Sequence, residues 1–159
     1  MIENQDAPNG QLSRWPFCFV RGFSMDTDDL VRLFEAGTMP EGGFHHAQHV
    51  QVAWAYLRRF PLPQALARFS DGLKRFAAAQ GATGLYHETI TVVFVLLINE
   101  RLADDGSGGG DWDAFACRHP ELLAWKPSVV DDYYSPETLW SDRARRTFVM
   151  PDRAPAPRT

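Results

Sequence analysis

Three histidines are the side chains of this sequence best suited to hold a metal ion. His46 and His49 stand at positions i and i+3 of a predicted helix, a spacing that lets two imidazoles reach one ion. On a helical wheel, His46 is central on the apolar stripe through Val50, and His49 lies at the edge of that stripe. His87, in the first turn of a second predicted helix, is the expected third ligand. The predicted cofactor is one divalent metal ion, Zn(II) or Fe(II).

Glu88 directly follows His87 and is the predicted catalytic residue. Its carboxylate could act as a general base on a metal-bound water, or complete a set of histidine and carboxylate ligands. A metal that lowers the pKa of its bound water to about 7 would supply hydroxide for hydrolysis or elimination. The alternatives are structural. Glu88 would then be an acidic residue that favours a helix N-terminus, and the histidines would be hydrogen-bonded core side chains.

Five further polar side chains are predicted to bind substrate: Tyr56, Tyr86, Thr91, Tyr134 and Arg143. Tyr56 and Tyr86 could present hydroxyls to a pocket, and Thr91, one helical turn beyond the third histidine, could orient it. Tyr134 precedes a predicted helix N-terminus, which favours an anionic group. Arg143 shares a helix side with apolar residues and could point inward to a carboxylate. The alternatives are a packing role for the tyrosines and Thr91, and solvent exposure for the arginine.

Two helices must bring these side chains together. Residues 85–100 run from a polar head into nine apolar or β-branched residues, and a helix that is apolar all round is normally the central one of a bundle. The Ile, Thr and Val content would also suit a strand, but no neighbouring stretch alternates with period two to pair with it. Residues 45–59 form the other predicted helix. We expect the two helices to face each other, with the site at their N-terminal ends.

The remaining pattern predicts an all-α single domain over residues 1–159, with four main helices plus short C-terminal helices. The first helix is expected over 26–37, where an aspartate caps its start and a glycine ends it. The third is expected over 63–81, because a proline suits its first turn, apolar residues recur at intervals of 3 and 4, and a glycine ends it. Short helices are expected to begin near three residues: Asp111, Pro120 and Ser135.

Composition restricts the classes of partner. With 16 basic and 20 acidic residues, a net charge of -4 and no basic stripe, the chain does not suit nucleic acid. The longest apolar run is about half of a membrane span and the N-terminus lacks signal-peptide features, which predicts a cytoplasmic location. Cys18 and Cys117 could bridge, but two free thiols in a reducing cytosol are expected. Residues 1–13 and 151–159 are expected to be flexible, and a homodimer is left open.

Five short motifs follow one another along the chain. They are F-x-H-x-x-H-V, A-W-x-Y-L, Y-H-E-T-I-T, Y-Y-S and F-V-x-P-D, which begin at Phe44, Ala53, Tyr86, Tyr133 and Phe148. Together they resemble a family of small, largely uncharacterised bacterial proteins over most of residues 38–152. The resemblance implies a compact helical protein, favours His46 over His45 as a functional residue, and implies no particular reaction.

The predicted function is that of a metal-dependent hydrolase or lyase acting on a small molecule. If Glu88 is a ligand, a non-heme iron oxygenase is the alternative. A non-enzymatic small-ligand-binding or accessory protein, with histidines and tyrosines lining a pocket, is the second alternative, and a structural interaction module is the third. The position of His87 relative to the other two histidines separates these functions, because one ion cannot bridge side chains more than about 10 Å apart.

Overall fold

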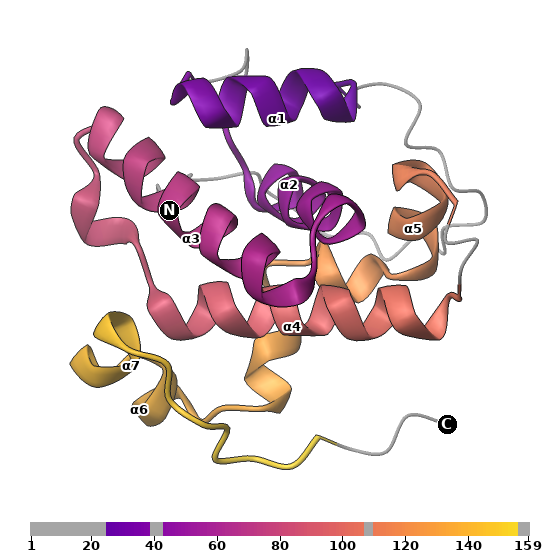
Figure 1. Ribbon diagram of the computed structural model, residues 1–159. Helices are drawn as coiled ribbons and strands as arrows, with labels where there is room; N and C mark the ends of the chain where they lie inside the picture. Colours follow the sequence, from indigo (N-terminus) through magenta and orange to yellow (C-terminus); the bar gives the residue numbers. More distant parts are fainter. Residues whose placement is uncertain (1–24, 39–42, 107–109, 156–159) are drawn as a thin grey trace, which may run out of the picture.

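The described part of the protein consists of helices and connecting loops, without a strand (Figure 1). It is a computed structural model that describes residues 25–38, 43–106 and 110–155. The α-helices are α1 (Thr27–Ala36), α2 (His46–Arg59), α3 (Leu62–Ala79), α4 (Glu88–Asp104), α5 (Trp112–Arg118), α6 (Pro136–Leu139) and α7 (Asp142–Arg146). Three short 3₁₀ helices join them: η1 (Thr83–Leu85), η2 (Pro120–Leu122) and η3 (Val129–Asp132). The predicted all-α fold with four main helices is confirmed.

The helix α4 is the centre of the fold. It contacts α2, α3 and α7, while α1 lies on the other side of the α2 and α3 pair (Figure 1). Its buried apolar residues occupy almost every position of two turns: Val93, Phe94, Val95, Leu97 and Ile98. Packing on several sides explains why this segment has no amphipathic pattern. A helix can be buried on all sides because its backbone N–H and C=O groups are hydrogen-bonded to one another within the helix.

The helix boundaries follow from local capping. The carboxylate of Asp26 accepts hydrogen bonds from the backbone N–H groups of Asp28 and Asp29 at the start of α1. Gly37 ends this helix in the left-handed conformation at φ 68°, which favours glycine. At the start of α2, the backbone N–H of His45 donates to the side chain of Gln48. These caps agree with the predicted starts and ends to within a few residues.

Gly72 allows a close approach between α1 and α3, and it supports a testable prediction. A Cβ atom on Gly72 would lie 2.7 Å from Cζ of Phe34, whose ring is buried against Phe69 and Phe76. Gly72→Ala should gain about 1 kcal/mol in helix propensity but lose roughly 2 to 3 kcal/mol by overpacking. The net result should be a lower free energy of unfolding in urea. The same substitution should cost less in a Phe34→Leu background, and an equal cost in both backgrounds would contradict this explanation.

The C-terminal part departs from the sequence prediction in its last helix. This helix is broken, because α6 ends at Leu139 and Ser141 caps a separate helix α7. Asp152, which lies in the segment expected to be flexible, contacts the start of α6. The carboxylate of Asp152 accepts hydrogen bonds from the hydroxyls of Ser135 and Thr138, at 2.6 and 2.7 Å. The predicted flexible arm at 1–13 lies outside the described residues.

Two further findings concern the length of the apolar helices and the state of Cys117. No helix in the described ranges is long and apolar enough to cross a membrane. Cys117 is disulfide-bonded, so the expectation of a free thiol at this position is wrong; Cys18 lies outside the described residues. Disulfides are rare in reducing compartments, so cysteine usage no longer supports the cytoplasmic prediction.

Candidate functional site

His46 lies in an aromatic environment and is hydrogen-bonded within the protein. Its Nε2 atom donates to the carbonyl oxygen of Leu122 at 2.9 Å. The ring centroid lies 4.7 Å from that of Phe94 on α4 and 5.2 Å from that of Trp125. Burial lowers the pKa of His46, and the hydrogen bond to Leu122 only partly opposes this effect. The side chain is therefore a neutral imidazole at neutral pH.

His49 is oriented toward a different aromatic group. Its ring centroid is 4.7 Å from that of Phe44. Burial, with a smaller contribution from His46, lowers the pKa of His49 to about 3. A side chain with this pKa stays neutral throughout the physiological range.

His87 is the N-cap of α4, immediately before the first turn in which it was predicted. Its Nδ1 atom accepts a hydrogen bond from the backbone N–H of Ile90 at 3.3 Å. Its Nε2 atom donates to the carbonyl oxygen of Leu139 at 2.8 Å. These two bonds define a neutral tautomer in which both nitrogens are occupied. His87 is only 7% exposed, so its imidazole lies inside the protein, where both ring nitrogens are hydrogen-bonded to backbone groups.

The three histidines are not brought together as metal ligands. His46 packs on Phe94, which is seven residues beyond His87 and thus about 10 Å further along the α4 axis. No group of three or more His, Cys, Asp or Glu side chains in the described ranges could hold a metal ion. The residues therefore do not fit the predicted site, since Nε2 of His46 and both ring nitrogens of His87 bind separate backbone groups.

The residues around His87 join α4 to the C-terminal segment. The hydroxyl of Thr89, fully buried, donates to the carbonyl oxygen of Thr147 and accepts from the backbone N–H of Val149. The hydroxyl of Tyr134 donates to the carbonyl oxygen of Val149 at 2.7 Å. We call these bonds, with that of His87 to Leu139, the C-terminal clasp. Tyr134 thus has a structural contact in place of the predicted substrate contact, and the hydroxyl of Thr91 likewise donates to the His87 carbonyl.

The clasp places α7 beside the start of α4 and creates a cleft of about 310 Å³. The cleft is lined by residues of α3, η1, the link from η1 to α4, α4 and α7: Lys74, Thr83, Gly84, Tyr86, Glu88, Arg145 and Arg146. It therefore combines two predicted site residues, Tyr86 and Glu88, with three basic side chains. We call it the basic cleft.

Hydrogen bonding orders the interior of the basic cleft. The hydroxyl of Tyr86 donates to Oε2 of Glu88 at 2.8 Å, and Nζ of Lys74 lies 3.5 Å from the same oxygen. The Lys74 ammonium also lies 4.9 Å from the centroid of the Tyr86 ring. Burial, together with the bond to Glu88, raises the pKa of Tyr86 to about 12. Tyr86 is thus a hydrogen-bond donor at neutral pH and fixes the Glu88 carboxylate.

Sequence reasoning missed the three basic side chains of this cleft. Lys74 belongs to the helix predicted over 63–81, and Arg145 and Arg146 follow the helix start predicted near Ser135, but none of the three was predicted to bind substrate. Arg145 donates to the carbonyl oxygen of Gly84 at 3.2 Å, across 61 residues of sequence. No local pattern predicts such a contact. The only available signal was the cluster of three arginines after residue 142.

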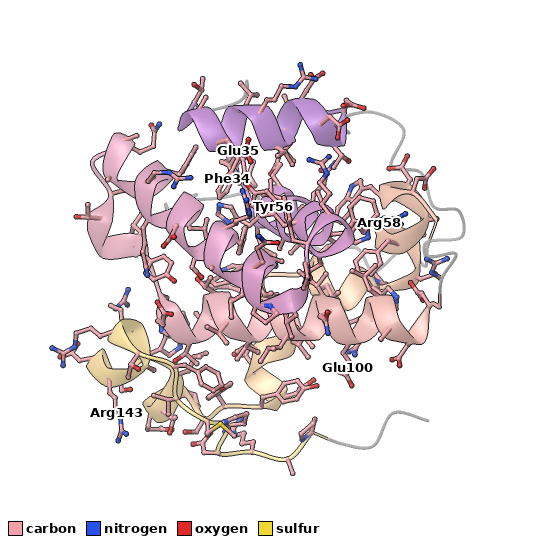
Figure 2. All side chains as sticks on the ribbon, viewed as in Figure 1. Phe34, Glu35, Tyr56, Arg58, Glu100 and Arg143 are labelled. Atoms are coloured by element: carbon pink, nitrogen blue, oxygen red, sulfur yellow. The ribbon has the colours of Figure 1, made fainter. Side chains whose placement is uncertain are left out.

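The other two predicted substrate residues lie elsewhere. Arg143 is exposed, points away from the helical bundle and lines neither of the two clefts described for residues 25–38, 43–106 and 110–155 (Figure 2). Tyr56 is buried on α2 and donates its hydroxyl to Oε1 of Glu35 at 2.9 Å. The structure thus separates Tyr56 from Tyr86 and Glu88.

Comparison of this chain with models of protein families, with curated proteins and with solved structures finds no match. The family resemblance of the five motifs therefore stays a prediction.

Proposed function

We propose that the protein binds a small organic anion in the basic cleft. The observation that carries the proposal is the excess of positive charge around one carboxylate. Lys74, Arg145 and Arg146 line the same cleft as Glu88 in a chain whose net charge is -4. A local reversal of sign against the overall charge favours a negatively charged ligand.

The chemistry of the lining suggests how such a ligand is held. Guanidinium groups match the geometry of carboxylates and phosphates, so Arg145 and Arg146 would bind the anionic group. Glu88 accepts hydrogen bonds, so it would bind a hydroxyl or amine elsewhere on the ligand. The volume of about 310 Å³ lies at the lower end of the range for small-molecule sites. His87 acts indirectly, since its bond to Leu139 contributes to the clasp that positions α7.

The binding function is preferred to the metal-dependent functions predicted from the sequence. Both nitrogens of His87 bind backbone groups, and Nε2 of His46 does so as well. A hydrolase, lyase or oxygenase built on His46, His49 and His87 would need these bonds to break and the rings to converge. Those functions stay predictions without a set of ligands among the described side chains.

Inorganic phosphate is a suitable first probe, because it is the simplest anion that pairs with guanidinium groups. We expect isothermal titration to show millimolar binding to the full chain. Arg146→Glu should weaken this binding by about tenfold or more, as expected for loss of a charged hydrogen bond. Arg143→Glu is the matched control, because it makes the same change of charge in the same helix outside the cleft.

Glu88→Gln provides the second variant. It removes the negative charge from the cleft and should tighten phosphate binding several-fold, because phosphate repels the carboxylate. Equal weakening by Arg146→Glu and Arg143→Glu would mean a general charge effect and would contradict the proposal. Absence of phosphate binding by both the native protein and Glu88→Gln would also reject it.

A further inference from the structure

A second cleft lies between α1, α2 and α3, on the part of the molecule that contains Tyr56. Its volume is about 480 Å³. Its polar lining comes from six residues: Glu35, Tyr56, Gln64, Arg68, Asp71 and Arg75. None of them lines the basic cleft, so the two are separate sites. We call this one the mixed-charge cleft.

The mixed-charge cleft contains two positive and two negative side chains that do not neutralise one another by direct contact. Asp71 and Arg75 stand at i and i+4 on α3, a spacing at which opposite charges often pair. Nevertheless, the ion pairs found within the described ranges include neither of them, nor Glu35 or Arg68. The guanidinium of Arg68 lies 4.3 Å from the centroid of the Phe60 ring. These charged groups are therefore available to a ligand.

A buried tyrosine fixes one of the carboxylates. Tyr56 is only 2% exposed, and its hydroxyl donates to Oε1 of Glu35 across the gap between α2 and α1 (Figure 2). Burial raises the pKa of Tyr56, and the bond to Glu35 adds to this effect, so the hydroxyl remains a donor. This bond orients Glu35, an otherwise exposed side chain. Tyr56 uses only Oε1 of the carboxylate and does not bind Oε2. A pre-oriented carboxylate beside unpaired guanidinium groups is suited to a ligand that carries both signs of charge.

We infer that the mixed-charge cleft binds a zwitterionic α-amino acid. The ammonium group would pair with Glu35 and Asp71, and the carboxylate with Arg68 and Arg75. Arg68, Asp71 and Arg75 alternate in sign along one face of α3, so opposite charges are presented close together. The volume accommodates an amino acid with a large side chain. The inference does not depend on anion binding in the basic cleft.

The test uses the full chain and the common L-amino acids as probes, measured by isothermal titration. At least one should bind. For the tightest of them, the N-acetyl and amide derivatives should each bind at least about tenfold more weakly, because each lacks one charge. Arg75→Gln and Asp71→Asn should each weaken binding by a similar factor. Arg32→Gln, an exposed arginine of α1 outside the cleft, should leave it unchanged.

Tyr56→Phe tests the positioning role. The substitution keeps the buried ring but releases Glu35. It should therefore weaken binding of the amino acid more than binding of its N-acetyl derivative, because the derivative has no ammonium group to pair with Glu35. Arg146→Glu should not alter amino-acid binding, which keeps this test independent of the phosphate experiment. The inference would be overturned if no amino acid bound at 10 mM or less, or if the two single-charge derivatives bound as tightly as the parent.

Discussion

Replacing His87 with alanine should lower the free energy of unfolding by about 3 kcal/mol. The imidazole is 7% exposed and makes two hydrogen bonds to backbone groups. Its removal leaves the carbonyl of Leu139 without this donor, removes the cap of α4 and opens a cavity beside Trp140, whose ring centroid is 5.8 Å away. For a chain of this length the melting temperature should fall by roughly 6 to 12 °C. Urea unfolding and calorimetry measure both quantities.

His46→Ala is the comparison for this prediction. His46 is more exposed and has one hydrogen bond to backbone, so its loss should cost less than that of His87. A chelator tests whether the loss of stability in His87→Ala comes from a lost metal site or from the lost hydrogen bonds. If the native protein holds no structural metal through His87, adding EDTA should leave its melting temperature unchanged. A fall with EDTA that matches the His87→Ala value would restore the prediction of a metal site.

The helical framework could be predicted because its determinants are local. Asp26 is followed by backbone N–H groups that need an acceptor, and Gly37 adopts a conformation that other residues disfavour. The apolar run of α4 could be recognised as central because no single face of it was polar. These signals lie within a few residues of the structure they determine, so one sequence contains them.

The candidate site could be predicted only in part, because its geometry depends on distant contacts. Glu88 and Tyr86 were identified, and they do line a cleft. The partner of His87 is the carbonyl of Leu139, 52 residues away, and no residue type indicates where a carbonyl will be found. A buried histidine beside a second helix has the same sequence pattern whether it binds a metal or a carbonyl. The pattern was therefore ambiguous.

The break between α6 and α7 had a further consequence for the prediction. A continuous helix from Ser135 would have placed Arg143 on the side of Leu139. The turn at Trp140 and the new cap at Ser141 instead leave Arg143 exposed and place Arg145 and Arg146 at the basic cleft. The Ser141 cap was visible in the sequence, since its hydroxyl precedes an aspartate at the first helical position. The prediction did not use this signal and placed a single helix start at Ser135 and Pro136.

Acidification should destabilise the protein well before its carboxylates titrate. His46, His49 and His87 all have a folded-state pKa below the value of about 6.5 that they would have unfolded. Below that pH the unfolded chain binds more protons than the folded one, so stability falls as the pH falls. For His49, whose pKa is lowered to about 3, the loss should approach 1.4 kcal/mol per pH unit between about pH 6 and pH 4. Above about pH 7.5 these histidines should contribute no pH dependence.

Urea unfolding at pH 7.5, 6.5, 5.5 and 4.5 measures this slope. The slope reports how many more protons the unfolded chain binds than the folded one, and His49→Gln should lower that number by about one. Gln51→Leu, a change at a buried residue of the same helix that does not titrate, is the matched control and should leave the slope as it is. The carboxylates act in a lower window. Hydrogen bonds from Ser135 and Thr138 lower the pKa of Asp152 to about 2, so its contribution is present above about pH 4 and lost below it. A stability that stays constant from pH 7.5 to 4.5 would show that the histidines are accessible to protons in the folded state, contrary to the buried, carbonyl-bound geometry of His87.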